Sequence, residues 1–465
     1  MVSGRLLAVS ERDPNRRFVF FVAAIAALAG GLFGYDTGII SGAILFIRHD
    51  FSLSVLETSF VVSSILIGAI LGSAFASTIV DRVGRRKAVI LAAIVFGAGA
   101  IWTALSPNTP VLVAGRVVTG LAIGLASSTA PVYISEVAPA ARRGTMTSFF
   151  QLATTVGMTV SYLVAFLLAP AEAWRIMLIL AIVPALLLGI GMFFMPPSPR
   201  WLIEAGRIDE ARRVLKRLLD PVEHDIETEI ADIRATVEGQ TRKWSELLAP
   251  GVKPALFVGL SLAVLQQVTG INTVLYYAPT VFQSAGLTSA AAAILAQFGV
   301  GIVFVITSIV AINLIDRVGR RPLLLWGLAG MTIGLGVIGL GFAVAEEGGM
   351  LAWIAVGSLM FYVAAFAFSL GPVFWLMNAE IYPLHVRGRA SSLGSLTNWS
   401  SNFVVTMAFL PLVHAIGESS TFWLFAVVCV FAIIWSSIFV PETKDKTLEE
   451  IEQIWTARAE RTGRP

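Results

Sequence analysis

Long runs of apolar residues, separated by short polar stretches, dominate the chain. A helix needs roughly 20 mostly apolar residues to cross the hydrocarbon core of a bilayer. Twelve runs are this long, at roughly 18–47, 58–79, 88–105, 111–135, 146–168, 174–195, 254–279, 290–315, 322–344, 351–378, 390–414 and 421–440. The pattern predicts an all-α polytopic membrane protein of twelve transmembrane helices in two six-helix bundles. Short helices are expected between the bundles and at the C-terminus.

The charged residues support this prediction by their number and their placement. Only 14% of the 465 residues are charged and 56% are hydrophobic, whereas a soluble domain is about 25% charged. Of the 63 charged residues, 37 lie in positions 1–17, 200–250 and 442–465, which leaves 26 among the other 373. This distribution excludes a soluble fold, a disordered chain and a nucleic-acid-binding protein.

Lysines and arginines in the short loops set the expected orientation. Eleven of them follow the second, fourth, eighth and tenth runs, while only Arg48 and Arg175 lie in the opposite set of loops. We therefore expect both termini to be cytoplasmic. The expected domains are a cytoplasmic N-terminus (1–17), an N-terminal bundle (18–199), a cytoplasmic helical linker (200–252), a C-terminal bundle (253–441) and a cytoplasmic tail (442–465).

A charged motif is repeated in the two halves of the chain. DRVGRR follows the second run at 81–86 and the eighth run at 316–321. SEVAPAARRG after the fourth run and AEIYPLHVRG after the tenth form a looser pair. Because the motifs follow equivalent runs, the halves are expected to be parallel repeats. This symmetry is typical of a rocking transporter whose substrate site lies between its halves.

The charged residues of these motifs are candidates for a cytoplasmic gate. Pairs across the interface would hold that face closed, although each exposed pair is worth only about 0–1 kcal/mol, so a network is needed. The alternative is that the arginines only fix the topology, and the repeated acidic partners favour the gate. The candidates are Asp81, Arg82, Arg85, Glu136, Arg143, Asp316, Arg317, Arg320, Glu380 and Arg387.

Together these motifs resemble the sugar porter family of the major facilitator superfamily, which includes bacterial sugar–proton symporters and the animal glucose facilitators. Further matching stretches cover nearly the whole length, among them GYDTGIISGA (34–43), PVYISEVAP (131–139), PPSPRWL (196–202), QQVTGINTVLYYAP (266–279) and PETK (441–444). The resemblance implies a major facilitator fold and transport of a monosaccharide or related polyol.

Three amides lie close together in the seventh run, namely Gln266, Gln267 and Asn272. Amides both donate and accept hydrogen bonds and so suit neutral hydroxyl groups. Gly270 allows the helix to break there and line a cavity, while the alternative is hydrogen bonding between helices. The resemblance implies that these amides bind sugar together with Gln151, Trp375 and Asn398, and that Tyr276 and Tyr277 form an outer gate.

At one position the chain departs from the family pattern. The family has an Asn in the eighth span, twelve residues before the acidic residue of the repeated motif, and this chain has Phe304. We therefore expect a changed hydrogen-bond pattern at one sugar hydroxyl, so specificity for D-glucose or D-xylose does not carry over from the family; a different sugar or a cyclic polyol is an alternative.

Asp36 lies inside the first run, where a carboxylate costs about 2.5–3.5 kcal/mol on insertion scales. Arg116 is the only basic residue in the core of the fourth run. A structural ion pair is one interpretation. The other is proton coupling, because a carboxylate titrates when its partner and its solvation change. The family's symporters have Asp at the matching position and its facilitators have Asn, so the resemblance implies coupling.

The sequence thus predicts proton-coupled symport of a monosaccharide or related polyol into the cell by alternating access. A proton-independent uniporter and a non-transporting sugar sensor are the alternatives. The expected partners are the sugar or polyol, protons and the lipid bilayer, with no nucleic acid, no cofactor and no metal. No nucleophile–base pair has convincing spacing, so we expect no enzyme. We also expect a functional monomer. A bacterial plasma membrane is expected because the short loop between the first two runs has no glycosylation acceptor, and because 27 arginines against 6 lysines indicate a GC-rich genome.

Overall fold

The computed structural model describes residues 14–139, 143–219, 225–238, 244–249, 251–345, 348–383, 386–444, 450 and 455. Within these ranges the regular structure is helical. The first half contains α1 (Pro14–Asp50), α2 (Val55–Val83), α3 (Arg85–Ala104), α4 (Thr109–Val137), α5 (Arg143–Leu168), η2 (Ala169–Ala171), α6 (Trp174–Ile179) and α7 (Ile182–Phe194). The sixth span is therefore split into α6 and α7.

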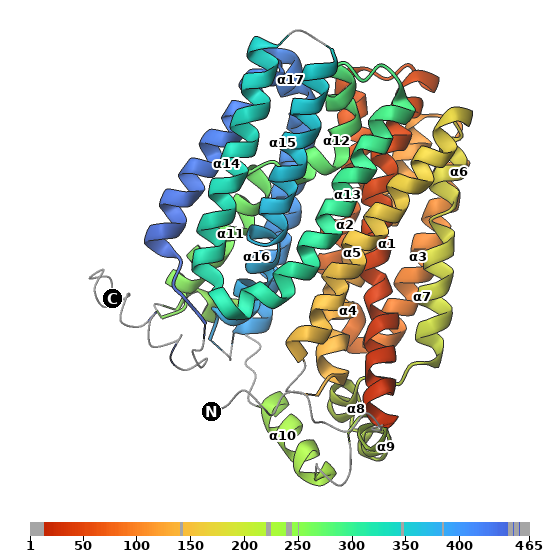
Figure 1. The fold of residues 1–465 in the computed structure, drawn as a ribbon. Coiled ribbons are helices and arrows are strands. Elements are labelled where there is room, and N and C mark those ends of the chain that lie inside the picture. The colour runs from red at the N-terminus through yellow and green to blue at the C-terminus, as the bar shows by residue number, and fades with distance from the viewer. Residues whose placement is uncertain are drawn as a thin grey trace.

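The second half follows a set of short helices and has two split spans. The linker holds α8 (Pro199–Glu204), α9 (Ile208–Leu218), α10 (Ile226–Glu238) and η3 (Trp244–Leu248). The second half contains α11 (Lys253–Val268), α12 (Ile271–Ser284), α13 (Ala290–Val318), α14 (Arg320–Val344), α15 (Gly349–Ala367), α16 (Leu370–Glu380) and α17 (Arg387–Phe439). Figure 1 shows the two halves side by side, with α8, α9 and α10 at one end.

The longest helix, α17, contains two membrane spans. Its 53 residues are interrupted by Gly417, which has φ 81° and ψ 163°. An unbroken helix of that length would extend about 80 Å, far beyond a bilayer core of about 30 Å. By length and composition, eleven helical stretches in the described chain can cross a membrane, and the last is this double span. The all-α polytopic prediction is confirmed.

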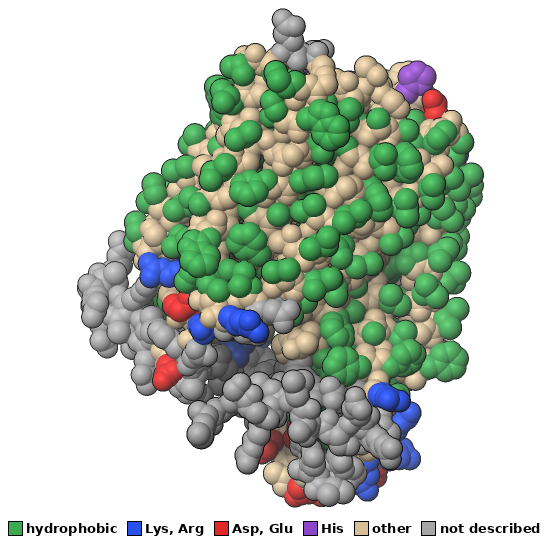
Figure 2. Space-filling view, viewed as in Figure 1, with side chains coloured by type: hydrophobic (Ala, Val, Ile, Leu, Met, Phe, Trp, Pro, Cys, Tyr) green, Lys and Arg blue, Asp and Glu red, His purple; other side chains and the backbone are tan. Residues whose placement is uncertain are grey.

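The surface side chains form a broad apolar belt around the protein and a charged region at one end (Figure 2). We name the charged end the arginine-rich end and the other the opposite end. The short helices α8, α9 and α10 lie at the arginine-rich end (Figure 1). The arginine-rich end is defined by Arg82, Arg85, Arg86, Arg317, Arg320 and Arg321, which lie at the α2–α3 and α13–α14 turns.

The repeated motif adopts the same backbone conformation in both halves. Gly84 ends α2 with φ 86° and ψ 157°, and Gly319 ends α13 with φ 103° and ψ 162°. Glycine adopts positive φ at little steric cost, which other residues do not. The equivalent turns support the parallel repeat that the sequence predicts.

The linker packs through an apolar face. Ala211, Val214, Leu215 and Leu218 are buried on α9, and Ile203 is buried on α8. On the polar side of α9, the Arg212 guanidinium contacts Asp209 at 2.6 Å and Glu227 at 2.5 Å.

Within the N-terminal half, α2 and α4 approach so closely that only glycine fits at the contact. A Cβ atom on Gly120 would lie 2.0 Å from the Ile65 carbonyl oxygen, and one on Gly68 would lie 2.0 Å from the Val117 carbonyl oxygen. Small residues at such contacts let helix backbones pack tightly in a membrane.

Gly120→Ala tests this contact. The new methyl group has no room beside Ile65, so we expect a loss of about 1–3 kcal/mol in the free energy of unfolding. Gly336→Ala on α14 is the matched control, because nothing lies within 4 Å of its Cβ position. Thermal unfolding of the purified protein in detergent measures both variants. Equal melting temperatures for the two would contradict the packing described.

Candidate functional site

The centre of the C-terminal half is built around a broken helix. The seventh span stops at Val268, resumes at Ile271, and has Gly270 at φ 94° between the two segments. The predicted break at Gly270 is confirmed. Irregular backbone at membrane depth is tolerated where it is buried in protein or lines a cavity.

Four amides meet at this break and form one hydrogen-bonded cluster. The Asn398 amide donates to Gln266 Oε1 at 2.6 Å, and Gln267 donates to Asn398 Oδ1 at 3.1 Å. Asn272, on the other side of the break, donates to Gln267 Oε1 at 2.6 Å. Gln266, Gln267 and Asn398 are each less than 5% exposed. We call these four side chains the amide cluster.

The amide cluster is joined to a second broken span. The tenth span is split between α15 and α16, with Ser369 at φ −125° and ψ −103°. Gln266 donates from Nε2 to the carbonyl oxygens of Leu370 and Gly371, each at 3.2 Å. A change in the bonding of Gln266 therefore acts on the seventh and tenth spans together.

The resemblance assigns two further residues to sugar, Gln151 and Trp375. Gln151 is half-buried on α5 of the N-terminal half. Trp375 is 39% exposed on α16, and its ring meets Phe374 at 4.9 Å between centroids. Both lie outside the hydrogen-bonded amide cluster, so their part in substrate binding stays a prediction.

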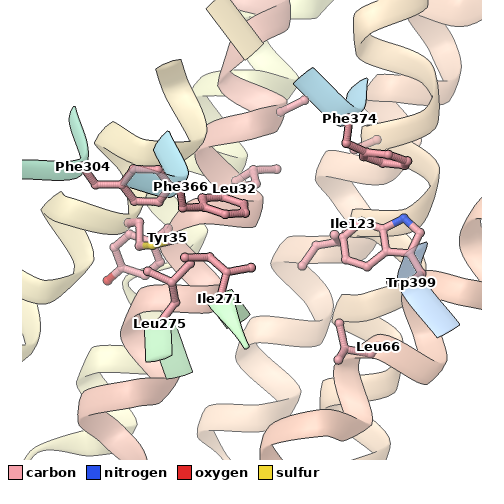
Figure 3. Packing of buried hydrophobic residues seen from close by; sticks show 14 of the residues in the cluster. Leu32, Tyr35, Leu66, Ile123, Ile271, Leu275, Phe304, Phe366, Phe374 and Trp399 are labelled. Atoms are coloured by element: carbon pink, nitrogen blue, oxygen red, sulfur yellow. The ribbon is translucent and has the colours of Figure 1, made fainter. Parts of the chain in front are cut away.

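Phe304 is a buried apolar side chain on α13. It is 4% exposed, and its ring packs edge-on against Phe366 at 6.4 Å between centroids. In Figure 3 the two rings lie in the same buried cluster as Leu32 and Tyr35 of α1. An aromatic ring offers no hydrogen-bonding group, in contrast to the amide of the family pattern.

In the N-terminal half, the structure brings Asp36 and Arg116 together. Nη1 of Arg116 lies 3.0 Å from Oδ1 and 2.8 Å from Oδ2 of Asp36. Nη2 of Arg116 donates to the Val62 carbonyl oxygen at 3.3 Å. Arg116 is 1% exposed and Asp36 is 5% exposed. The pair thus links α1, α4 and α2 through charges that are almost fully dehydrated.

The helix α12 connects the ion pair with the amide cluster. Tyr276 lies four residues after Asn272, so both side chains lie on one face of α12. Tyr276 is 1% exposed and faces Thr37 of α1 and Asn402 of α17. Asn272 therefore bonds the amide cluster while Tyr276 packs beside the residue that follows Asp36.

The two halves contact each other mainly through α2 with α17, α5 with α13 and α1 with α12, and also through α1 with α13. Across the halves, the rings of Phe33 and Trp399 meet edge-on at 5.3 Å between centroids. Within the C-terminal half, Tyr277 is fully buried and its ring stacks on that of Phe409 at 5.3 Å between centroids. Since α12 is the part of the seventh span nearer the opposite end, its contact with α1 joins the two halves on that side.

At the arginine-rich end, the ion pairs that the structure shows lie within each half. Arg85 contacts Glu136 and Glu204, each at 3.0 Å, and Ser198 donates to Glu136 at 2.5 Å. In the other half, Arg320 contacts Glu380 at 3.2 Å. The predicted pairing between the halves is not among the described contacts, so the gate stays a prediction.

The remaining gate candidates are placed as follows. Asp81 and Arg82 are exposed at the end of α2, and Arg317 is exposed at the end of α13. The guanidinium of Arg387 donates to the Tyr382 carbonyl oxygen at 3.0 Å. The side chains of Arg143 and Asp316 lie outside the described residues.

Sequence reasoning missed several partners of the gate candidates. Glu204 and Ser198 complete the cluster around Arg85, and Thr443 donates to Glu380 at 3.0 Å. Ser198 and Thr443 belong to PPSPRWL and PETK, which the sequence analysis used only as marks of resemblance. These polar residues directly after the last apolar run of each half were the available signal.

A charge-balance experiment tests the buried ion pair. Arg116→Gln removes the cation and leaves Asp36 without its partner, so we expect a loss of about 3–5 kcal/mol in stability. Asp36→Asn combined with Arg116→Gln removes both charges, so most of that stability should return. Thermal unfolding of the purified variants measures the difference. A double variant less stable than Arg116→Gln would contradict a pair held together by charge.

Known proteins are similar in sequence to this one over almost the whole chain. The profile of the family "Sugar (and other) transporter" matches residues 22–455. The putative metabolite transport protein YwtG of Bacillus subtilis is 44% identical over 443 residues, covering 95% of each chain. The galactose-proton symporter of Escherichia coli K12 is 38% identical over 447 residues, covering 96% of each chain.

A solved structure shows the same fold. The proton:xylose symporter XylE of the major facilitator superfamily, bound to 6-bromo-6-deoxy-D-glucose, superposes with a TM-score of 0.81 at 33% identity. The match covers 95% of this chain and all of that one. The chain is therefore a multi-pass membrane transporter with the major facilitator fold, and it belongs to the sugar transporter family.

Proposed function

We propose that this protein carries a monosaccharide or a related polyol into a bacterial cell together with a proton, by alternating access. The observation that carries the proposal is the dehydrated Asp36–Arg116 pair of the N-terminal half, at 2.8 Å, together with the cluster of neutral amides in the C-terminal half. The carboxylate of Asp36 supplies the coupling, because it binds Arg116 when it is ionised and releases Arg116 when it takes up a proton. Amides supply hydrogen bonds to sugar hydroxyls without binding ions.

Similarity to characterised proteins supports the same function. One relative is a galactose-proton symporter and the neighbouring solved structure is a proton:xylose symporter. Both names combine a neutral sugar with a proton. The amide cluster suits the hydroxyls of a neutral sugar, and the Asp36–Arg116 pair suits a proton.

Proton and sugar transport are coupled because Arg116 and a proton compete for the carboxylate of Asp36. While Asp36 is ionised, Arg116 holds it to α4, and the carbonyl of Val62 fixes the other side of the guanidinium. Protonation removes the attraction and frees α1 to move relative to α4. Because α12 contacts α1 beside Asp36 and the amide cluster at Asn272, the protonation state of Asp36 affects the binding of sugar.

The proposed orientation places the arginine-rich end in the cytoplasm, as the excess of arginine in its loops favours. Both termini are then cytoplasmic. The opposite end faces outward, so the conformation described is closed to the outside. Each chain has its own amide cluster and its own ion pair, so a monomer suffices for transport.

The experiment is uptake into proteoliposomes with a panel of labelled sugars and polyols, with and without an imposed proton gradient. A one-unit pH gradient drives about tenfold accumulation at one proton per sugar. We expect Asp36→Asn to abolish this accumulation and to keep exchange of labelled for unlabelled sugar, because the neutral side chain cannot cycle a proton.

Asp209→Asn on α9 is the matched control, because it makes the same chemical change at a side chain that is 92% exposed. It should accumulate sugar as the unmodified protein does. Gradient-driven accumulation by Asp36→Asn would show that Asp36 is not the coupling site. Uptake that ignores the proton gradient in the unmodified protein would support a uniporter, and binding without uptake would support a sensor.

Phe304→Asn tests whether the side chain at position 304 contributes to the choice of sugar. The substitution places an amide where the ring packs against Phe366, so we expect the ratio of kcat/KM between sugars that differ at one hydroxyl to change about tenfold or more. Dependence on the proton gradient should be unchanged. If the ratios in the sugar panel stay the same, Phe304 does not contact the substrate.

A further inference from the structure

A proline leaves a free backbone acceptor in α12. The carbonyl of Leu275 would normally accept from the N–H four residues later, but that residue is Pro279, which has none. The side chain of Gln297 on α13 fills the gap, since its Nε2 donates to the Leu275 carbonyl oxygen at 2.8 Å. This bond also fixes the orientation of the amide, because its nitrogen must face the carbonyl.

The other half of the protein contacts the same group. The hydroxyl of Tyr162 on α5 donates to the Leu275 carbonyl oxygen at 3.4 Å. Ser41 on α1 donates to Gln297 Oε1 at 2.9 Å and shares its proton with the Gly38 carbonyl at 2.7 Å. Ser41, Tyr162 and Gln297 are each at most 1% exposed.

The helices of the two halves approach each other closely beside this network. A Cβ atom on Gly301 of α13 would lie 2.9 Å from Tyr162 of α5. One on Gly42 of α1 would lie 3.4 Å from Ile294 of α13. The side chains of the two halves are therefore in direct contact around the hydrogen bonds.

The network lies toward the opposite end of the bundle. Ser41 is nine residues before the end of α1 at Asp50, and Gln297 is seven residues after the start of α13 at Ala290. At about 1.5 Å per residue, these positions are about 10–14 Å below the helix ends. The network therefore lies at a depth where the halves must separate when that end opens.

We propose that Ser41, Tyr162 and Gln297 form a latch that holds the opposite end closed, anchored on the carbonyl that Pro279 leaves free. This inference rests on the alternating-access function proposed above. Opening breaks the Ser41–Gln297 and Tyr162–Leu275 hydrogen bonds, and the Leu275 carbonyl then keeps a single partner. The latch sets the population of the open state, and these residues position helices rather than bind sugar.

A buried thiol reports the opening directly. Ser59 of α2 is fully buried and faces Tyr277 of α12 across the halves, so Ser59→Cys changes one atom at the closed contact. Cys429 is the only native cysteine, and Cys429→Ala gives a background without it. The rate at which a charged, membrane-impermeant thiol reagent modifies the new cysteine then measures how often the opposite end opens.

We expect Ser41→Ala, Tyr162→Phe and Gln297→Leu to accelerate this modification. A neutral hydrogen bond contributes about a factor of five to such an equilibrium. Tyr162→Phe should therefore raise the rate up to about fivefold, and Gln297→Leu should raise it more. Ser41→Ala should add little to Gln297→Leu, because the two residues share one bond.

Two control variants each remove a serine or tyrosine hydroxyl that is bonded within its own half and does not bridge the halves. Ser161 donates to the Met158 carbonyl of its own helix, and Tyr362 donates to the Thr269 carbonyl of its own half. Ser161→Ala and Tyr362→Phe should leave the rate unchanged.

Unchanged rates in all three latch variants, or equal acceleration in the controls, would overturn the latch. The labelling needs neither sugar nor a proton gradient, so its outcome is independent of the uptake experiment. Ser41→Ala and Tyr162→Phe each delete one hydroxyl, which keeps the test valid if Gln297→Leu does not fold.

Discussion

One ion pair in an apolar bundle constrains the rest of the molecule. A carboxylate and a guanidinium that are almost fully buried must stay paired, because either one alone would be a dehydrated charge. Asp36 and Arg116 meet at 2.8 Å and so fix α1 against α4. A proton is the smallest species that can replace Arg116 as the partner of Asp36, which makes the geometry of the N-terminal half sensitive to protonation.

The substrate chemistry lies in the other half and is neutral. The amide cluster is closed on itself, with bonds of 2.6 Å from Asn398 to Gln266 and from Asn272 to Gln267. Sugar hydroxyls can replace these bonds one for one, so binding need not leave an amide unpaired. Because α12 carries Asn272 and also packs beside Asp36, neither site can rearrange without affecting the other.

The apolar runs of the sequence and the glycines that interrupt them predict most of the fold. The apolar runs predict the spans, and Gly270 predicts the break in the seventh. The breaks in the sixth and tenth spans were missed, although Pro184 and Pro372 lie in the first turns of α7 and α16. Proline removes the N–H that would continue the preceding helix. The partners of Arg85 and Gln297 could not be predicted, because they depend on how distant helices pack.

The central claim is that sugar and proton move together through the state of Asp36. The most direct measurement is the external pH of a weakly buffered suspension of proteoliposomes when the transported sugar is added with no gradient imposed. The account predicts that the external medium becomes alkaline as sugar enters, and that Asp36→Asn gives no pH change while it still exchanges sugar. Sugar entry through the unmodified protein with a constant external pH would contradict the account.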